Sequence, residues 1–153
     1  MASDSTEFSE RFFRVVLPGK WADVTRQTDE GVWEYESENG TERLTVSLFF
    51  ANNEQTDEEI SSMFDSFVRV RRQAEAEAGG QDVLLTDTVR RNVPNAIIGT
   101  YNGTEGMSRA FADKVIVNTF GIANFYYEAI GLTKESFELR RDAIFRETGF
   151  IGK

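Results

Sequence analysis

The chain has 153 residues, a net charge of −9 and neither histidine nor cysteine, which excludes the usual general base near neutral pH, thiolate nucleophiles, disulfides and the commonest zinc ligands. Its hydrophobic content of 40%, with thirteen phenylalanines, supplies a core without metal or disulfide support. The negative charge repels nucleic acid and anionic membrane, and it attracts a basic protein or a cationic ligand.

The predicted elements are strands bounded by turn signals, with two amphipathic helices among them. Pro18-Gly19 separates the first two strands. Asn39-Gly40 between two alternating segments is the strongest short hairpin signal, and Asn102-Gly103 indicates a later turn. The expected order is strands at 12–17, 21–25, 32–36 and 43–50, a helix at 56–78, strands at 83–90, 96–101, 107–117 and 120–129, and a helix at 133–148.

The middle helix is expected to begin at Thr56, which can form a capping box with Glu59, and to end at Gly79-Gly80. The last helix is expected to begin at Thr133 and to end at Gly149. The apolar stripe predicted for the middle helix comprises Ile60, Met63, Phe64, Phe67, Val70 or Arg71, and Ala74. The two faces predicted for the last helix comprise Phe137, Arg141, Ile144 and Thr148, and Leu132, Leu139, Ala143 and Phe150.

Residues 1–10 are polar and are expected to form a flexible N-terminal lead-in, and residues 11–150 a single domain, because no repeat or Pro-rich linker interrupts them. Two Asn-Gly-Thr triplets, at Asn39 and Asn102, have the form of glycosylation acceptors. We interpret both as hairpin turns. The order of the elements predicts an α+β class, an antiparallel β-sheet flanked by helices.

The passage from Phe13 to Trp21 contains an apolar strand, Leu17-Pro18, a short gap and a tryptophan, and it resembles the opening of the PsbP/DcrB-like family. This α/β/α sandwich is shared by the extrinsic PsbP protein of photosystem II, the yeast Ran-binding Mog protein and bacterial DcrB-type proteins. The hairpin at 33–50 and the order of the later elements support the likeness, which covers roughly residues 11 to 150.

The resemblance implies a PsbP-like sandwich and a non-catalytic role. Members of the family bind proteins, support the assembly of larger complexes or serve as chaperones for bacterial secreted effectors. The resemblance supplies no catalytic motif. The passage that carries it, Leu17-Pro18 with Trp21, is interpreted as structural.

Clustered aromatic residues supply the predicted contact surface, because exposed aromatic side chains on a sheet mark protein-binding surfaces or apolar grooves. Tyr126 and Tyr127 are adjacent on a strand and must face opposite sides, so one of them points away from the main core layer. Arg71, Arg90 and Arg91 would bind a carboxylate or phosphate if they converged. The residues expected to contact a partner are Trp33, Tyr35, Tyr126 and Tyr127, with Arg90 and Arg91 as flanking charge.

The favoured function is a non-enzymatic protein-binding module: an assembly factor, a secretion chaperone or an immunity-type protein whose acidic surface suits a basic partner. No catalytic residue, cofactor or metal ligand is predicted. Glu34 and Glu36 are interpreted as the polar face of a strand, and the calcium-loop pattern is absent. The oligomeric state is left open.

Two alternatives from other functional classes remain. One is a carrier for a small apolar ligand or lipid, with its pocket under the long helix. The other is a carboxylate-based enzyme that uses a hard cation such as Mg²⁺ or Ca²⁺.

The chain lacks both an apolar run long enough to span a membrane and an N-terminal signal peptide pattern. The expected location is therefore cytoplasmic, or periplasmic if a signal peptide was removed.

Overall fold

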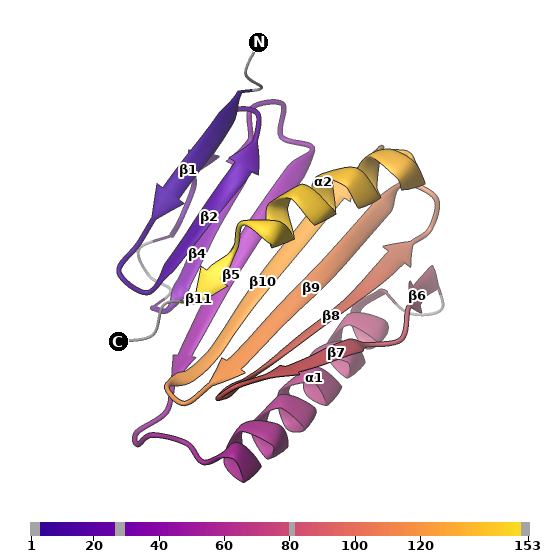
Figure 1. Ribbon diagram of the computed structural model, residues 1–153. Helices are drawn as coiled ribbons and strands as arrows, with labels where there is room; N and C mark the ends of the chain where they lie inside the picture. The colour runs from indigo at the N-terminus through magenta and orange to yellow at the C-terminus, as the bar shows by residue number, and fades with distance from the viewer. Residues whose placement is uncertain (1–3, 27–29, 80–81, 151–153) are drawn as a thin grey trace.

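The computed structural model describes residues 4–26, 30–79 and 82–150. They form two antiparallel sheets and two helices (Figure 1). Within this part of the chain, neither helix is apolar over a stretch long enough to cross a membrane. The elements are β1 (Ser5–Ser9), β2 (Phe13–Pro18), β3 (Trp21–Asp23), β4 (Val32–Ser37), β5 (Glu42–Phe50), α1 (Asp57–Gly79), β6 (Val83–Leu85), β7 (Val89–Val93), β8 (Ala96–Glu105), β9 (Arg109–Asn118), β10 (Gly121–Ile130), α2 (Lys134–Arg146) and β11 (Gly149–Phe150).

The large sheet has the order β3-β4-β5-β10-β9-β8-β6, and β7 also pairs with β8. The small sheet has the order β1-β2-β11. Helix α1 covers one face of the large sheet, and α2 together with the small sheet covers the other (Figure 1). We call these the α1 face and the α2 face. The predicted α+β sandwich is therefore confirmed.

The core on the α2 face is built by strand alternation. Inward residues of β2, β4, β5 and β10 meet the buried side of α2, where Phe137, Ile144 and Phe145 lie. Each buried side chain of this size contributes roughly 1.5–3 kcal/mol. The fully buried members on the strands are Phe13, Val15, Leu17, Tyr35, Leu44, Val46, Ala112, Ala123, Phe125 and Tyr127.

Helix α1 begins with the predicted capping box. The amide of Thr56 donates to Glu59 Oε1 at 3.0 Å, and the amide of Glu59 donates to Thr56 Oγ1 at 3.2 Å. The first three turns pack on the sheet through Ile60, Phe64 and Val68, which are 2–7% exposed.

The predicted apolar stripe of α1 is wrong toward the C-terminal end of the helix. Val70 is 59% exposed, and Ala74 is also exposed. The inward position after Val68 is Arg71, followed one turn later by Glu75, and both are only partly exposed. Periodicity alone did not decide between Val70 and Arg71. The arginine faces inward because a buried carboxylate lies beneath it, as described below.

Two predictions for the strands differ from the structure. Residues 83–90 form two short strands, β6 and β7, which pair with successive parts of β8. Asn102 lies inside β8 and not in a turn; the chain reverses at Gly106, where φ is +60°. Gly103 has a packing role, because a Cβ there would lie 2.2 Å from Phe111 Cζ. The predicted turn at Asn39-Gly40 is present, with Gly40 at φ +75°.

The ends of the chain also differ from expectation. Ser5–Ser9, part of the predicted flexible lead-in, form β1 and pair with β2, and the ring of Phe8 stacks on Tyr35 at 4.2 Å. The alternation that places Phe8 inward is too short and too polar to predict a strand. In α2, Leu139 is 73% exposed and does not belong to the second predicted apolar face, whereas Leu132 and Phe150 of that face pack against the core. Helix α2 ends at Arg146, and the following residues form β11 on β2.

Candidate functional site

The structure does not gather the six predicted contact residues on one surface. Tyr35 and Tyr127 have no exposed area. The ring of Tyr127 stacks on Phe137 of α2 at 5.3 Å, and its hydroxyl donates to Glu42 Oε1 at 2.6 Å. Their assignment as contact residues is wrong, because the small sheet and α2 form a second layer over these strand positions.

The other two predicted aromatic residues lie on opposite faces of the large sheet. Trp33 is on the α2 face, partly buried, with its ring 5.0 Å from that of Phe13. Tyr126 is on the α1 face, where the guanidinium carbon of Arg71 lies 5.6 Å from its ring centre. The four aromatic residues therefore form no common contact surface.

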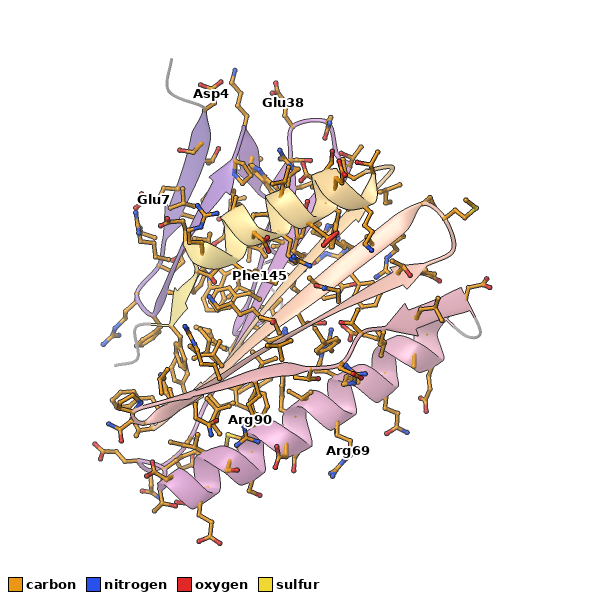
Figure 2. All side chains as sticks on the ribbon, turned by 45° about the vertical axis from the view of Figure 1, so that its right-hand side comes forward. Asp4, Glu7, Glu38, Arg69, Arg90 and Phe145 are labelled. Atoms are coloured by element: carbon orange, nitrogen blue, oxygen red, sulfur yellow. The ribbon has the colours of Figure 1, made fainter. Side chains whose placement is uncertain are left out.

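Arg71, Arg90 and Arg91 do not converge on one site. Arg90 lies on the α1 face, where it contacts Asp65 at 3.0 Å and Ser61 at 3.1 Å and so ties β7 to α1 (Figure 2). Arg91, the next residue, pairs with Ile98 of β8 and lies on the α2 face. Adjacent strand residues face opposite sides, so these two arginines cannot bind one ligand together.

A groove runs between α2 and the strands β6, β7 and β8, on the part of the α2 face that the small sheet does not reach (Figure 2). It consists of two adjoining hollows of about 480 Å³ and about 570 Å³. Both hollows are lined by Thr86, Asn102 and Arg141. The two hollows together are called the groove.

One end of the groove is cationic. Four cationic side chains and two carboxylates line it, although the chain carries a net charge of −9. Arg141 is paired with Asp142 at 2.8 Å. In residues 4–26, 30–79 and 82–150, no carboxylate lies within ion-pair distance of the other three cations. These three are Arg91, Lys114 and Arg146, and the remaining carboxylate of the lining is Asp87.

Lys114 lies on the floor of this cationic end. Its Nζ donates to the carbonyl of Phe145 at 2.6 Å and to Thr148 Oγ1 at 2.9 Å, at the C-terminal end of α2. Burial, and to a smaller extent the positive charge of Arg91, together lower the pKa of Lys114 to about 8. The ammonium is thus held in place by neutral oxygens beside a second cation.

The other end of the groove is open and has more apolar side chains in its lining, although Arg109, Lys134, Glu138 and Arg141 also line it. Met107 and Leu84 have exposed fractions of 104% and 71%. Leu132 and Phe137 of the α2 segment line the same hollow from the opposite side. A ligand that fills the whole groove would meet exposed hydrocarbon at one end and positive charge at the other.

A second polar cluster lies on the α1 face, beneath the last turns of α1. Asp113 is fully buried; Asn124 Nδ2 donates to its Oδ1 at 2.9 Å, and Arg71 Nη2 lies 3.8 Å from the same oxygen. Arg71 also contacts Glu75 at 2.9 Å, and the Tyr101 hydroxyl donates to Glu75. Burial, reinforced by Glu75, raises the pKa of the Asp113 carboxyl well above its usual range.

This cluster does not support the alternative of a carboxylate-based enzyme. Neither Asp113 nor Glu75 lines any of the five best-formed hollows among the described residues, so none of these hollows brings a substrate to them. Within the same part of the chain, no group of three or more acidic side chains is placed to hold a metal ion. We interpret the cluster as the means by which the last turns of α1 pack on the sheet.

The lipid-carrier alternative placed its pocket under the long helix. There, Ile60, Phe64 and Val68 fill the space against the sheet and are almost completely buried. The hollow beside α1 is lined by charged residues as well, among them Asp65 and Arg69. The geometry under α1 therefore offers no support for an apolar ligand.

Comparison with solved structures places this architecture among known folds. The solution structure of cyanobacterial PsbP (CyanoP) from Synechocystis sp. PCC 6803 is similar over 98% of this chain and 94% of its own, with a TM-score of 0.72 and 15% sequence identity. The Saccharomyces cerevisiae Ran-binding protein Mog1p is similar over 99% and 97%, with a TM-score of 0.54 and 12% identity. No family model and no curated protein matches the sequence.

This chain has the PsbP/Mog1-like fold. The fold predicted from the Phe13–Trp21 passage and the order of the elements is thereby confirmed. At these identities the likeness concerns the fold alone, so the function has to be argued from the groove.

Proposed function

We propose that this protein is a non-catalytic binding module that holds a segment of another protein in the groove. The observation that carries the proposal is the open groove itself, with exposed apolar side chains such as Met107 at one end and cations without carboxylate partners at the other. Soluble proteins rarely expose such combinations without a binding role. A protein of the same fold, Mog1p, is described as Ran-binding, which supports a protein as the partner.

The proposal changes the contact residues that the sequence suggested. Of the six, Arg91 lines the groove, whereas Tyr35 and Tyr127 stabilise its surroundings from within the core. The net charge of −9 favours a basic partner for the molecule as a whole. The cationic end of the groove, in contrast, is locally positive. An assembly factor, a secretion chaperone and an immunity-type protein are specific forms of this function.

Site-specific photo-crosslinking tests the location of the partner. A benzophenone amino acid replaces Met107, in the groove, or Val70, which is 59% exposed on α1. In extracts of the native organism we expect a discrete protein adduct from position 107 and none from position 70. Adducts of equal yield at both positions, or at position 70 alone, would contradict the proposal.

A further inference from the structure

The three cations at one end of the groove approach it from different elements. Lys114 rises from β9, Arg91 belongs to the edge strand β7, and Arg146 is the last residue of α2. Arg91 and Arg146 are exposed, so their side chains can adjust to a ligand. Such a cage of long cationic side chains around an ammonium on the groove floor is open to one small anionic group.

The neutral partners of Lys114 position its charge without compensating it. The carbonyl of Phe145 and the hydroxyl of Thr148 accept hydrogen bonds from Nζ, which fixes the ammonium against the end of α2. The described residues place no carboxylate within 4.0 Å of Nζ, and Arg91 adds like charge. An anion bound here would relieve that repulsion and would accept charge-assisted hydrogen bonds, which are about twice as strong as neutral ones.

The net charge of the protein and the apolar end of the groove indicate which kind of anion binds here. A long polyanion such as nucleic acid would extend past the groove onto a protein of net charge −9 and be repelled. One or two carboxylates within an otherwise neutral segment avoid that repulsion. The apolar end, where Leu84 and Met107 are exposed, requires that the same segment also carry apolar side chains.

We propose that the groove binds an acidic, partly apolar peptide segment of its partner, with a carboxylate seated between Arg91, Lys114 and Arg146 and an apolar side chain beside Leu84 and Met107. This inference rests on the proposed function, because it names the chemistry of the segment that the groove holds. Specificity comes from the two ends together, because the segment has to carry both a carboxylate and an apolar side chain.

Selection from a library of short random peptides displayed on phage, with the purified chain as bait, tests the inference. We expect the selected peptides to combine Asp or Glu with leucine-like residues, and the synthetic peptides to bind more weakly as ionic strength rises. Arg91→Gln and Arg146→Gln should each raise Kd about tenfold, as expected for loss of a hydrogen bond to a charged group. The matched control is Arg69→Gln, since Arg69 points away from the sheet on α1 and should leave Kd unchanged (Figure 2).

Lys114→Gln is measured as a second variant together with its thermal unfolding, because Lys114 also holds the end of α2. The exposed positions 91 and 146 keep the test valid if this variant unfolds. Acidic peptides whose Kd is unchanged by both arginine variants would overturn the inference.

The selection also separates this inference from the proposed function. Peptides that need Arg91 or Met107 but show no enrichment in Asp or Glu would overturn the acidic assignment and leave the binding groove in place. A selection that returns no peptide dependent on groove residues would contradict both.

Discussion

Asp113 and Lys114 are neighbours on β9, yet the fold treats their charges differently. Asp113 faces α1, is fully buried, and has Arg71 and Asn124 as partners within the protein. Lys114 faces α2 and the groove, and its hydrogen bonds go to neutral oxygens of Phe145 and Thr148. Asp113, whose partners lie within the protein, belongs to the packing of a helix, and Lys114, which has no carboxylate partner, marks a surface where a ligand can supply one.

The same contrast holds within the α2 face. Glu42 is 6% exposed and accepts hydrogen bonds from Tyr127 at 2.6 Å and from Arg140 Nη2 at 2.8 Å. This group ties α2 to β5 and β10. The groove lies on the other side of α2, where Arg91, Lys114 and Arg146 have no such carboxylate acceptors among the described residues. The compensated charges thus fix the walls of the site, and the uncompensated ones remain available inside it.

The largest effect is expected for Asp113→Ala. This change removes the acceptor of the buried Asn124 amide and one of the two carboxylates beside Arg71, which keeps Glu75 at 2.9 Å, so the free energy of unfolding should fall by about 3–4 kcal/mol. Asp113→Asn, which keeps one oxygen acceptor, should cost less. Urea unfolding measures both, with Asp142→Ala as the exposed control at about 0.5 kcal/mol or less. A loss below about 1 kcal/mol for Asp113→Ala would show that the cluster is not what packs α1 on the sheet.

An intermediate effect is expected for Glu42→Ala. Arg140 remains partly solvated, with 32% of its side chain exposed, so the loss should be about 2–3 kcal/mol, from the unpaired Tyr127 hydroxyl and guanidinium. The nearby exposed Glu38 supplies the control, Glu38→Ala. Because the change loosens a wall of the groove, the affinity for the selected peptides should fall as well. If Glu42→Ala were as stable as Glu38→Ala, Glu42 would not stabilise the packing of a helix as Asp113 is expected to do.

The fold could be predicted because its signals are local. The Asn39-Gly40 turn, the Thr56–Glu59 capping box and strand alternation each depend on residues close in sequence, and the structure contains all three. The misplaced turn at Asn102 had a non-local cause, since Gly103 is needed for the ring of Phe111 on the next strand.

The site could not be predicted in the same way, because burial depends on a second layer. The alternating pattern of its strand is compatible with an exposed Tyr35. The residue is buried because Phe8 of β1 packs over it. One signal was available in the sequence: Asp113-Lys114 interrupts the apolar run of β9, so one charge must face each side of the sheet. Which of the two would lack a partner depended on where α1 and α2 packed.

The smallest effect, with the opposite sign, is expected for Lys114→Met. The pKa of Lys114 is lowered from 10.5 to about 8, first by burial and then by Arg91. Between these two values the unfolded chain binds more protons than the folded one, so the penalty for the charge is fully present below about pH 8 and disappears as the pH rises toward 10.5. Relative to the variant, the wild type should therefore gain stability over this window, on the order of 1 kcal/mol because the group is partly solvated.

Urea unfolding of both proteins at the two ends of the window gives the difference, and titration of the tyrosines cancels in it. Lys134→Met, at the exposed start of α2, is the matched control. A difference that stays flat across the window would mean that the ammonium of Lys114 is already compensated, and the contrast with Asp113 would then fail.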